Sequence, residues 1–312
     1  MDISVLDLGS NSFQLLFARC SRFARVERLF KSVEFVDLAA HVSERGEITA
    51  QGFNAALSAV ATLLERAPAA ARKKPLIAFA THAIREASNG SALLTALEAR
   101  TGVHARIVTG SEAARLAYIG AASEFELRAE RLAVVDLGGG STELAWGVGK
   151  HVGHCSSVRL GVTSLIHRLT EMPNTANVAL DHLAVFVRRS LEPAILAARE
   201  PPPDVLVFAS GVARVVQSVI VGSGLAPAGA PIDGRVMREA IPRLLVTPLS
   251  ELRQLGVPEQ RLKTVGPTAI VLEVVRDLFE KDEFIVAQGG LREGAALQGK
   301  ALGPQPWPNR AN

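Results

Sequence analysis

The stretch VLDLGSNSFQLLFA at residues 5–18 comes close to repeating as VVDLGGGSTELAWG at residues 134–147. Each copy is an apolar run that ends in Asp-Leu-Gly, followed by small residues and then by a second apolar run. Two short apolar runs joined by Gly, Ser and Asn predict a β-hairpin. The copies lie too far apart to be units of a solenoid, so they predict two related domains that each open with this hairpin.

The composition allows two globular domains and excludes several classes of protein. The chain has 312 residues, 48% of them hydrophobic and 21% charged, so it can build real cores and is not of the disordered class. It has no apolar run of the roughly 18 residues that a membrane-spanning helix needs, and MDISVLDLGS enters a strand pattern without a leader. Two cysteines fit a reducing compartment. We therefore expect a cytoplasmic protein without membrane contact.

Charge and aromatic content bear on the ligand. A net charge of +3 and a pI of about 9.1 are compatible with a polyanionic ligand. One Tyr and two Trp are too few for the interleaved basic and aromatic residues with which single-strand nucleic-acid binders stack bases. We expect a polyanion with few bases and no nucleic-acid partner.

Strand and helix patterns alternate along the chain, which predicts an α/β fold. In the first half we expect strands at 3–8, 13–18, 76–80 and 105–109, and helices at 50–67 (with Thr49 as N-cap), at 92–101 and from 112. In the second half we expect strands at 132–137, 143–148, 205–209 and 283–287, and helices at 181–198, 234–245, 267–279 and 291–302. The predicted domains are residues 1–125 and 126–302, with the option that the closing helix at about 291–302 packs back on the first domain. Residues 303–312 are expected to be a disordered, Pro-rich tail.

The turns of both hairpins suit a phosphate group. The small residues SNS at 10–12 and GGST at 139–142 allow backbone N–H groups to turn inward together, which makes a concave nest of donors for phosphate oxygens. Gly fits such a nest because no Cβ blocks the approach of an anion. An ordinary Gly-rich turn would explain one such stretch, but two matched copies with Asp at the same place favour phosphate binding.

The pair DLGSNS and DLGGGSTEL resembles the two phosphate-binding hairpins of the exopolyphosphatase and guanosine pentaphosphate phosphohydrolase (Ppx/GppA) family, within the actin, sugar kinase and Hsp70 superfamily. FATHAIREASN, VTGSEAARLAY, FASGVAR and QGGLREG follow in the family's order, so the resemblance covers nearly the whole chain. It implies two RNase H-like α/β domains facing across a phosphate-binding cleft. It also implies removal of terminal phosphate from polyphosphate or pppGpp with Mg²⁺ and, since relatives are often dimers, a homodimer.

The resemblance places the phosphate-binding residues in short segments. Arg85 lies about one helical turn beyond Thr81, so its guanidinium could fork onto phosphate oxygens. The two Gly loops follow predicted strands, and α/β sheets bind ligands at the carboxyl ends of strands. The expected phosphate-binding residues are Asp7, Gly9, Ser10, Asn11, Ser12, Thr81, His82, Arg85, Gly138, Gly139, Gly140, Ser141, Thr142, Ser210, Gly211, Gly289 and Gly290.

A magnesium site is expected at the second hairpin. Glu143 comes only two residues after Ser141, so it can face the bound phosphate and hold Mg²⁺ or a water together with Asp136. The first hairpin has Gln14 at the corresponding position. Because an amide replaces the carboxylate there, we expect the metal nearer the second hairpin, at Asp136 and Glu143.

Hydrolysis also needs a general base that removes a proton from the attacking water. The family's motif is Ser-Gly, any residue, Glu-Glu-Ala, and its second Glu activates the water; in this chain the motif reads TGSEAA at 109–114, so Ala113 takes that place. Glu112 lies about 100° around the helix from position 113 and is not expected to substitute without local rearrangement. Its alternative role is that of a first-turn carboxylate after an N-cap Ser111.

The residues and the resemblance together predict an exopolyphosphatase with a departure at its base position. Either Ala113 marks a weakened or non-catalytic member that binds polyphosphate or an alarmone as a regulator, or it replaces a glutamate so that substrate stays uncleaved. The intact phosphate loops favour the second explanation. The alternative enzyme is a pppGpp 5′-phosphohydrolase, although no motif indicates a guanine pocket, and a kinase of the same superfamily would need ATP and an acceptor.

Overall fold

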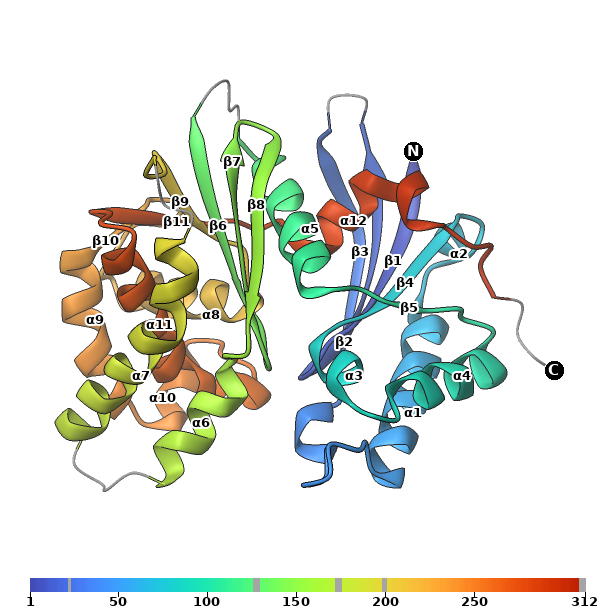
Figure 1. Cartoon of the computed structure of the whole chain (residues 1–312), viewed down its shortest axis with the longest axis horizontal. Helices are drawn as coiled ribbons and strands as arrows, with labels where there is room; N and C mark the ends of the chain where they lie inside the picture. Colours follow the sequence, from blue (N-terminus) through green and yellow to red (C-terminus); the bar gives the residue numbers. More distant parts are fainter. Residues whose placement is uncertain (22–23, 126–129, 172–175, 198–200, 309–312) are drawn as a thin grey trace. The chain divides into compact units, whose positions relative to one another are not determined.

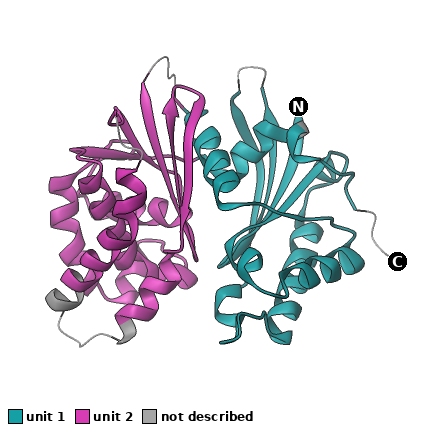
Figure 2. Cartoon of the chain, in the orientation of Figure 1, with its two compact units in different colours: residues 1–124, 289–312 teal, residues 125–288 magenta. Residues whose placement is uncertain are grey.

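The computed structural model of the chain describes residues 1–21, 24–125, 130–171, 176–197 and 201–308 (Figure 1). The chain divides into two compact units, Met1–Glu124 with Gly289–Asn312, and Phe125–Gln288 (Figure 2). The closing segment therefore belongs to the first unit, which is the option that the sequence analysis gave for the helix at about 291–302, and the second unit ends at Gln288 rather than at residue 302. In the described part of the chain, no helix is both long enough and apolar enough to cross a membrane.

The first unit is built on a five-stranded sheet in the order β3-β2-β1-β4-β5. Its first three strands are antiparallel neighbours, and β4 and β5 run parallel to β1. The strands are β1 (Asp2–Leu8), β2 (Ser12–Cys20), β3 (Val26–Phe35), β4 (Leu76–Ala80) and β5 (Arg106–Ile107). The helices are η1 (Leu38–His41), α1 (Ala50–Arg66), α2 (Ala69–Arg72), α3 (His82–Glu86), α4 (Gly90–Thr101), α5 (Gly110–Ala122), α12 (Leu291–Gln298) and η3 (Gly299–Leu302).

Alternating residues of β1 serve two separate cores, because successive side chains of a strand point to opposite faces. Leu6 and Leu8 pack with the apolar residues of α1 and α4. Ile3 and Val5 pack on the other face with α5 and α12. The described helices therefore cover both faces of the sheet, as Figure 1 shows.

Helices α5 and α12 approach each other closely because both carry glycine where they cross. A Cβ added to Gly120 would lie 1.9 Å from the carbonyl oxygen of Gly290, and one added to Gly294 would lie 1.9 Å from that of Leu116. Real Cβ atoms do not come this close to backbone, so only glycine allows this packing. This crossing attaches the closing segment to the first unit.

We expect Gly294→Ala to destabilise the protein by about 3 kcal/mol, because the new methyl group must push α12 off α5. The expected result is a lower denaturant midpoint in equilibrium unfolding. Gly222→Ala is the control, since Gly222 also lies in a helix, α8, and an added Cβ there meets only the flexible Leu255 side chain at 3.3 Å. Equal stability of the two variants would contradict the crossing just described.

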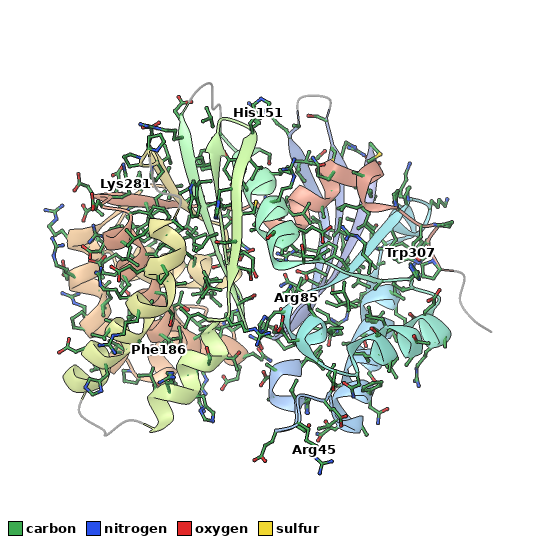
Figure 3. The ribbon with its side chains drawn as sticks, viewed as in Figure 1. Arg45, Arg85, His151, Phe186, Lys281 and Trp307 are labelled. Carbon is green, nitrogen blue, oxygen red and sulfur yellow. The ribbon has the colours of Figure 1, made fainter. Side chains whose placement is uncertain are left out.

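The predicted disordered tail is wrong for residues 303–308. The backbone of Gln305 exchanges hydrogen bonds of 2.8 and 2.9 Å with that of Leu76, and the side chain of Trp307, labelled in Figure 3, packs on the core between the sheet and α1. The tail is ordered because β4 offers it an unpaired backbone edge, which its own composition does not reveal. Residues 309–312 lie outside the described residues.

The second unit repeats the plan with a six-stranded sheet in the order β10-β11-β9-β6-β7-β8. Strands β6, β7 and β8 form an antiparallel meander, and β9 runs parallel to β6. The strands are β6 (Arg131–Leu137), β7 (Thr142–Val148), β8 (His151–Val158), β9 (Val205–Phe208), β10 (Ile232–Asp233) and β11 (Glu283–Val286). The helices are α6 (Val162–Glu171), α7 (Ala176–Leu196), α8 (Gly211–Gly222), α9 (Gly234–Val246), α10 (Leu249–Gln254), η2 (Glu259–Thr264) and α11 (Val265–Leu278).

Both hairpins and most other elements expected from the sequence are confirmed. Thr49 is the N-cap of α1 and accepts a hydrogen bond from the Gly52 amide. The strand expected at 105–109 is reduced to Arg106–Ile107, because at the edge of its sheet it pairs only with the last two residues of β4. Register sets Asp7 opposite Gln14 and Asp136 opposite Glu143, so the two hairpins superpose residue for residue.

Candidate functional site

The turn of the second hairpin directs its amides to one side. The carbonyl oxygens of Gly138 and Gly139 accept hydrogen bonds of 3.0 Å each from the amides of Val162 and Thr163 at the start of α6. In a trans peptide the carbonyl and the following N–H point in opposite directions. The N–H groups of Gly139 and Gly140 therefore point away from α6 together, which is the arrangement of an anion-binding nest.

The first turn is held in the same way. The Ser10 carbonyl accepts from the Ala39 amide at 3.2 Å, and the Asn11 carbonyl accepts from the amides of Val36 and Asp37 at 3.0 and 2.9 Å. The N–H groups of Asn11 and Ser12 are therefore directed away from these partners. In both units, the residues that follow the hairpin fix the turn through its carbonyls.

The segment after β4 lies against the first turn. The Thr81 amide donates to the Leu8 carbonyl at 3.1 Å, and the Ala83 amide donates to the hydroxyl of Ser10 at 3.2 Å. These two bonds connect the start of α3 to the end of β1. The structure thus brings Thr81 and His82 together with the first turn, as expected.

Arg85 is on α3 (labelled in Figure 3) and its guanidinium already has partners within the first unit. It donates to the Val108 carbonyl at 3.1 Å, pairs with Glu86 at 3.3 Å and approaches Nδ1 of His82 at 3.4 Å. The bond to Val108 connects α3 to the segment before α5. A guanidinium carries five N–H donors, so these contacts still leave donors for phosphate oxygens. Binding of phosphate by Arg85 stays a prediction.

Asp7 is the last residue but one of β1 and is buried, with 7% of the residue exposed. Its Oδ2 accepts a hydrogen bond of 3.1 Å from Nη1 of Arg292 at the start of α12. Its Oδ1 is buried, and none of the described residues gives it a hydrogen bond. Burial raises the pKa of this carboxyl and Arg292 only partly opposes that effect.

The second hairpin brings its two carboxylates side by side. Asp136 and Glu143 are directly opposite in the β6–β7 register, so their side chains share one face of the sheet. Glu143 is buried, and its Oε1 accepts hydrogen bonds from the hydroxyls of Ser141 at 2.6 Å and Ser157 at 2.9 Å. In the first hairpin the amide of Gln14 donates to Ser12 at 3.1 Å, so it occupies the equivalent place without a charge.

This pair fits Mg²⁺, which proteins bind through one or two carboxylates while phosphates and waters fill the remaining positions. Among the described residues, no group of three His, Cys, Asp or Glu side chains is placed to hold a metal by itself. A metal at Asp136 and Glu143 would therefore depend on the oxygens of the substrate. The hydroxyls of Ser141 and Ser157 fix the orientation of the Glu143 carboxylate.

Ala113 lies in the first turn and a half of α5 with only 1% of its surface exposed. It packs in the core that contains Val5, Phe79 and Val108. The methyl side chain of Ala113 cannot accept a proton. At the position of the family's glutamate, this chain therefore has the methyl group of Ala113.

Glu112 has the structural role that the sequence offered as its alternative, but with a different cap residue. The N-cap is Thr109 rather than Ser111, and Glu112 and Thr109 form a reciprocal capping box with bonds of 2.8 and 3.1 Å. Burial raises the pKa of Glu112, but the bonds from Thr109 and from Arg106 at 3.0 Å outweigh it and hold the pKa below the usual value. Such a carboxylate is a weak base.

The loop after β9 carries Ser210 and Gly211 at the start of α8. The Ser210 hydroxyl accepts from the Ala213 amide at 3.0 Å, so it caps the helix. A Cβ on Gly211 would lie 2.9 Å from the guanidinium of Arg261, which shows that this cation lies against the loop. Phosphate binding by Ser210 and Gly211 stays a prediction, and Arg261 adds positive charge beside them.

Gly289 and Gly290 do not belong to the second sheet, although they follow β11 in sequence. Gly290 precedes α12, where its amide donates to Glu293 at 3.0 Å, and a Cβ on Gly289 would lie 2.7 Å from the Gly120 carbonyl of α5. The packing of the first unit therefore requires glycine at 289, and the Gly290 amide is held by Glu293. Their role as phosphate ligands stays a prediction.

Sequence reasoning missed Arg261 and Arg292. Both contact expected site residues, but each lies far from its partner in the chain; the Arg292–Asp7 pair is separated by 285 positions. The sequence contained one signal for Arg292, its place in QGGLREG, which had been singled out for its glycines. Nothing in the local pattern singled out Arg261.

The Ppx/GppA phosphatase family model matches residues 20–300 of the chain. Proteins named exopolyphosphatase 1 from Mycobacterium bovis and from Mycobacterium tuberculosis H37Rv are 25% identical to it over 308 residues, which cover 96% of this chain and 88% of the relative.

Two solved structures share the fold. A Ppx/GppA family member from Aquifex aeolicus has a TM-score of 0.79 at 21% identity, and an exopolyphosphatase from Cytophaga hutchinsonii has 0.85 at 21% identity. Each comparison covers 96% of this chain and 98% of the other. The expected fold class, two α/β domains that each have a mixed sheet, is confirmed.

Proposed function

The chain belongs to the Ppx/GppA phosphatase family, whose members are hydrolases, and from this membership we propose that it is an exopolyphosphatase that removes terminal phosphate from inorganic polyphosphate with Mg²⁺. The observation that carries the proposal is the pair of matched turns, one in each unit, whose amides at 11 and 12 and at 139 and 140 point away from the elements that hold the carbonyls. A polyphosphate presents phosphate groups along its whole length, and repeated nests suit such a ligand.

The residues of each unit have distinct tasks in this proposal. In the first unit, the turn at 9–12 and Arg85 bind and orient a terminal phosphate. In the second unit, the turn at 138–142 binds phosphate, while Asp136 and Glu143 hold Mg²⁺, which when bound neutralises charge on the phosphoryl oxygens. Hydrogen bonds to Glu143 and Ser10 keep these groups in place before substrate arrives.

A pppGpp 5′-phosphohydrolase is the alternative enzyme, and a non-catalytic sensor of polyphosphate or (p)ppGpp is the alternative from another class. Both would use the same turns. The sensor is favoured by one specific observation, the methyl group of Ala113 at the family's base position. A homodimer and a cytoplasmic location stay predictions.

The test is phosphate release from short and long polyphosphate and from pppGpp, with Mg²⁺, comparing the chain with Ala113→Glu. We expect Ala113→Glu to raise kcat by about 10²-fold, since a positioned general base contributes about 10²–10⁴-fold. The chain itself should bind polyphosphate in equilibrium binding whether or not it turns over quickly.

Each result has a distinct meaning. Turnover of polyphosphate by Ala113→Glu supports the exopolyphosphatase, and a preference for pppGpp would support the alternative enzyme. If both proteins bind polyphosphate and neither releases phosphate, the enzyme proposal is wrong and the sensor takes its place.

A further inference from the structure

We propose that Asp7, held by Arg292, accepts the proton of the attacking water in this chain and so replaces the glutamate that is missing at position 113. The inference rests on the proposed function, hydrolysis of a phosphoanhydride bond. It assigns Asp7 a catalytic role in place of the phosphate-binding role expected from the sequence, and it gives Arg292 a positioning role.

The first observation is the uneven bonding of the Asp7 carboxylate. Oδ2 is occupied by Arg292 at 3.1 Å, whereas Oδ1 is buried and none of the described residues donates to it. A buried carboxylate oxygen without a donor is costly, so such an oxygen indicates a ligand that donates to it. A Cβ added to the nearby Gly9 would lie 3.9 Å from Oδ1 and only 2.8 Å from the Ser12 carbonyl oxygen, so the turn beside Asp7 requires glycine there.

The second observation is the face of the sheet on which Asp7 lies. Ile3 and Val5 point to the face covered by α5 and α12, and Asp7 follows in the same alternation. Ala113 packs in the core on that same face, with Val5 and with Phe79, the residue beside Asp7 in the β4 register. Asp7 therefore lies near the carboxyl end of β1, on the sheet face against which α5 packs with Ala113.

The third observation is that the other nearby carboxylates are committed. Glu293 on α12 bonds to the Gly290 amide at 3.0 Å and to Arg28 at 2.7 Å, and Arg28 also pairs with Glu124 at 3.0 Å. Glu112 is held in its capping box. Among the described residues of this region, Asp7 alone keeps a buried carboxylate oxygen without a donor.

The surroundings of Asp7 raise the pKa of its carboxyl and so favour proton acceptance. Burial raises its pKa, the Arg292 guanidinium lowers it in part, and the Glu293 carboxylate raises it. The net shift is upward, which brings the carboxyl closer to the pH of the reaction than the ordinary value of about 3.9. Gln14 on β2 is opposite Asp7 and carries no charge.

The step balances as a hydrolysis. The water oxygen forms a bond to the terminal phosphorus while one water proton passes to Oδ1 of Asp7. The bridging P–O bond breaks, and its electron pair leaves with the shortened polyphosphate. Inorganic phosphate is released, and Asp7 returns its proton to solvent.

The experiment measures kcat, KM and their pH dependence at saturating Mg²⁺ for the chain, Asp7→Asn, Ala113→Glu and the double variant, with polyphosphate binding measured separately. Asp7→Asn keeps the shape of the side chain. We expect it to lower kcat by about 10²-fold, to leave polyphosphate affinity within about threefold, and to remove the acid limb of the pH profile. In the Ala113→Glu background the same change should cost less than about fivefold, because the two carboxylates would share one task.

Two further variants separate catalysis from structure. Arg292→Gln should move the acid limb to higher pH, because loss of the cation raises the pKa of Asp7, whereas a purely structural role would not move it. Asp204→Asn is the matched control, because Asp204 also pairs with an arginine, Arg131, but lies at the opposite end of β6 from Asp136. It should leave kcat unchanged.

Several results would overturn the inference. The inference is wrong if kcat of Asp7→Asn lies within threefold of the kcat of the unchanged chain. It is also wrong if the acid limb of the pH profile persists in this variant. If a higher Mg²⁺ concentration restores kcat of Asp7→Asn, Asp7 is a metal ligand and not the base. A chain without turnover whose Ala113→Glu variant is active refutes the role of Asp7 but keeps the proposed function, whereas inactivity of both refutes the two together.

Discussion

Glu143→Gln is expected to lower kcat/KM for polyphosphate by about 10³-fold, in the chain and in the Ala113→Glu background alike. A bound metal supplies several kcal/mol of charge stabilisation, and about 1.4 kcal/mol corresponds to tenfold in rate. The amide keeps the size of the side chain and an oxygen that can accept from Ser141, so the turn should stay folded. What is lost is the negative charge opposite Asp136.

The measurement is phosphate release as a function of Mg²⁺ concentration. We expect the variant to need more Mg²⁺ for half-maximal activity, which distinguishes loss of a metal ligand from loss of a phosphate contact. Glu259→Gln is the control, because this exposed carboxylate pairs with Arg253 on the surface of the second unit. Equal Mg²⁺ requirements for the variant and the chain would contradict a metal at Asp136 and Glu143.

Gly161→Ala should impair the second turn and the stability of its unit at once. A Cβ at this position would lie 2.2 Å from the oxygen and 2.3 Å from the carbon of the Gly139 carbonyl, and 2.4 Å from the Gly140 nitrogen. These are the atoms that direct the amides of the nest. The methyl group must therefore displace the turn or the start of α6, at a cost of about 3 kcal/mol.

We expect a fall in the melting temperature of about 6–12 °C for a unit of this size, together with a loss of polyphosphate affinity of at least about tenfold. Calorimetry and equilibrium binding below the melting temperature measure the two effects separately. Gly153→Ala is the matched control, since its added Cβ would make its nearest contact at 3.5 Å, an ordinary distance. Unchanged affinity in Gly161→Ala would show that the turn's amides do not bind the phosphate chain.

Much of the fold could be predicted because it depends on local patterns. The apolar runs and small residues of the two hairpins, the Thr49 cap and the buried strand at 76–80 are each written in a few adjacent residues. Strands β3 and β8 were missed because they are edge strands with mixed side chains, half exposed, and lack a clear apolar run. Each of them forms because it pairs with the second strand of the neighbouring hairpin, β3 with β2 and β8 with β7.

The site divides in the same way. The sequence named both turns, Arg85 and the carboxylates at 7, 136 and 143, since residue type and spacing alone indicate phosphate and metal chemistry. It also showed that a methyl group stands at position 113. It gave the return of the closing segment to the first unit only as an option, because that return depends on contacts between distant residues.

By itself, then, the sequence determined the two hairpins, the α/β class and the family resemblance. The tertiary structure decided which partners those residues have. Arg292 reaches Asp7 across 285 positions, Gly294 allows α12 to pack on α5, and Gln305 pairs with the edge of β4. Such contacts are set by packing and by the burial of charge in three dimensions, and neither leaves a periodic mark in the chain.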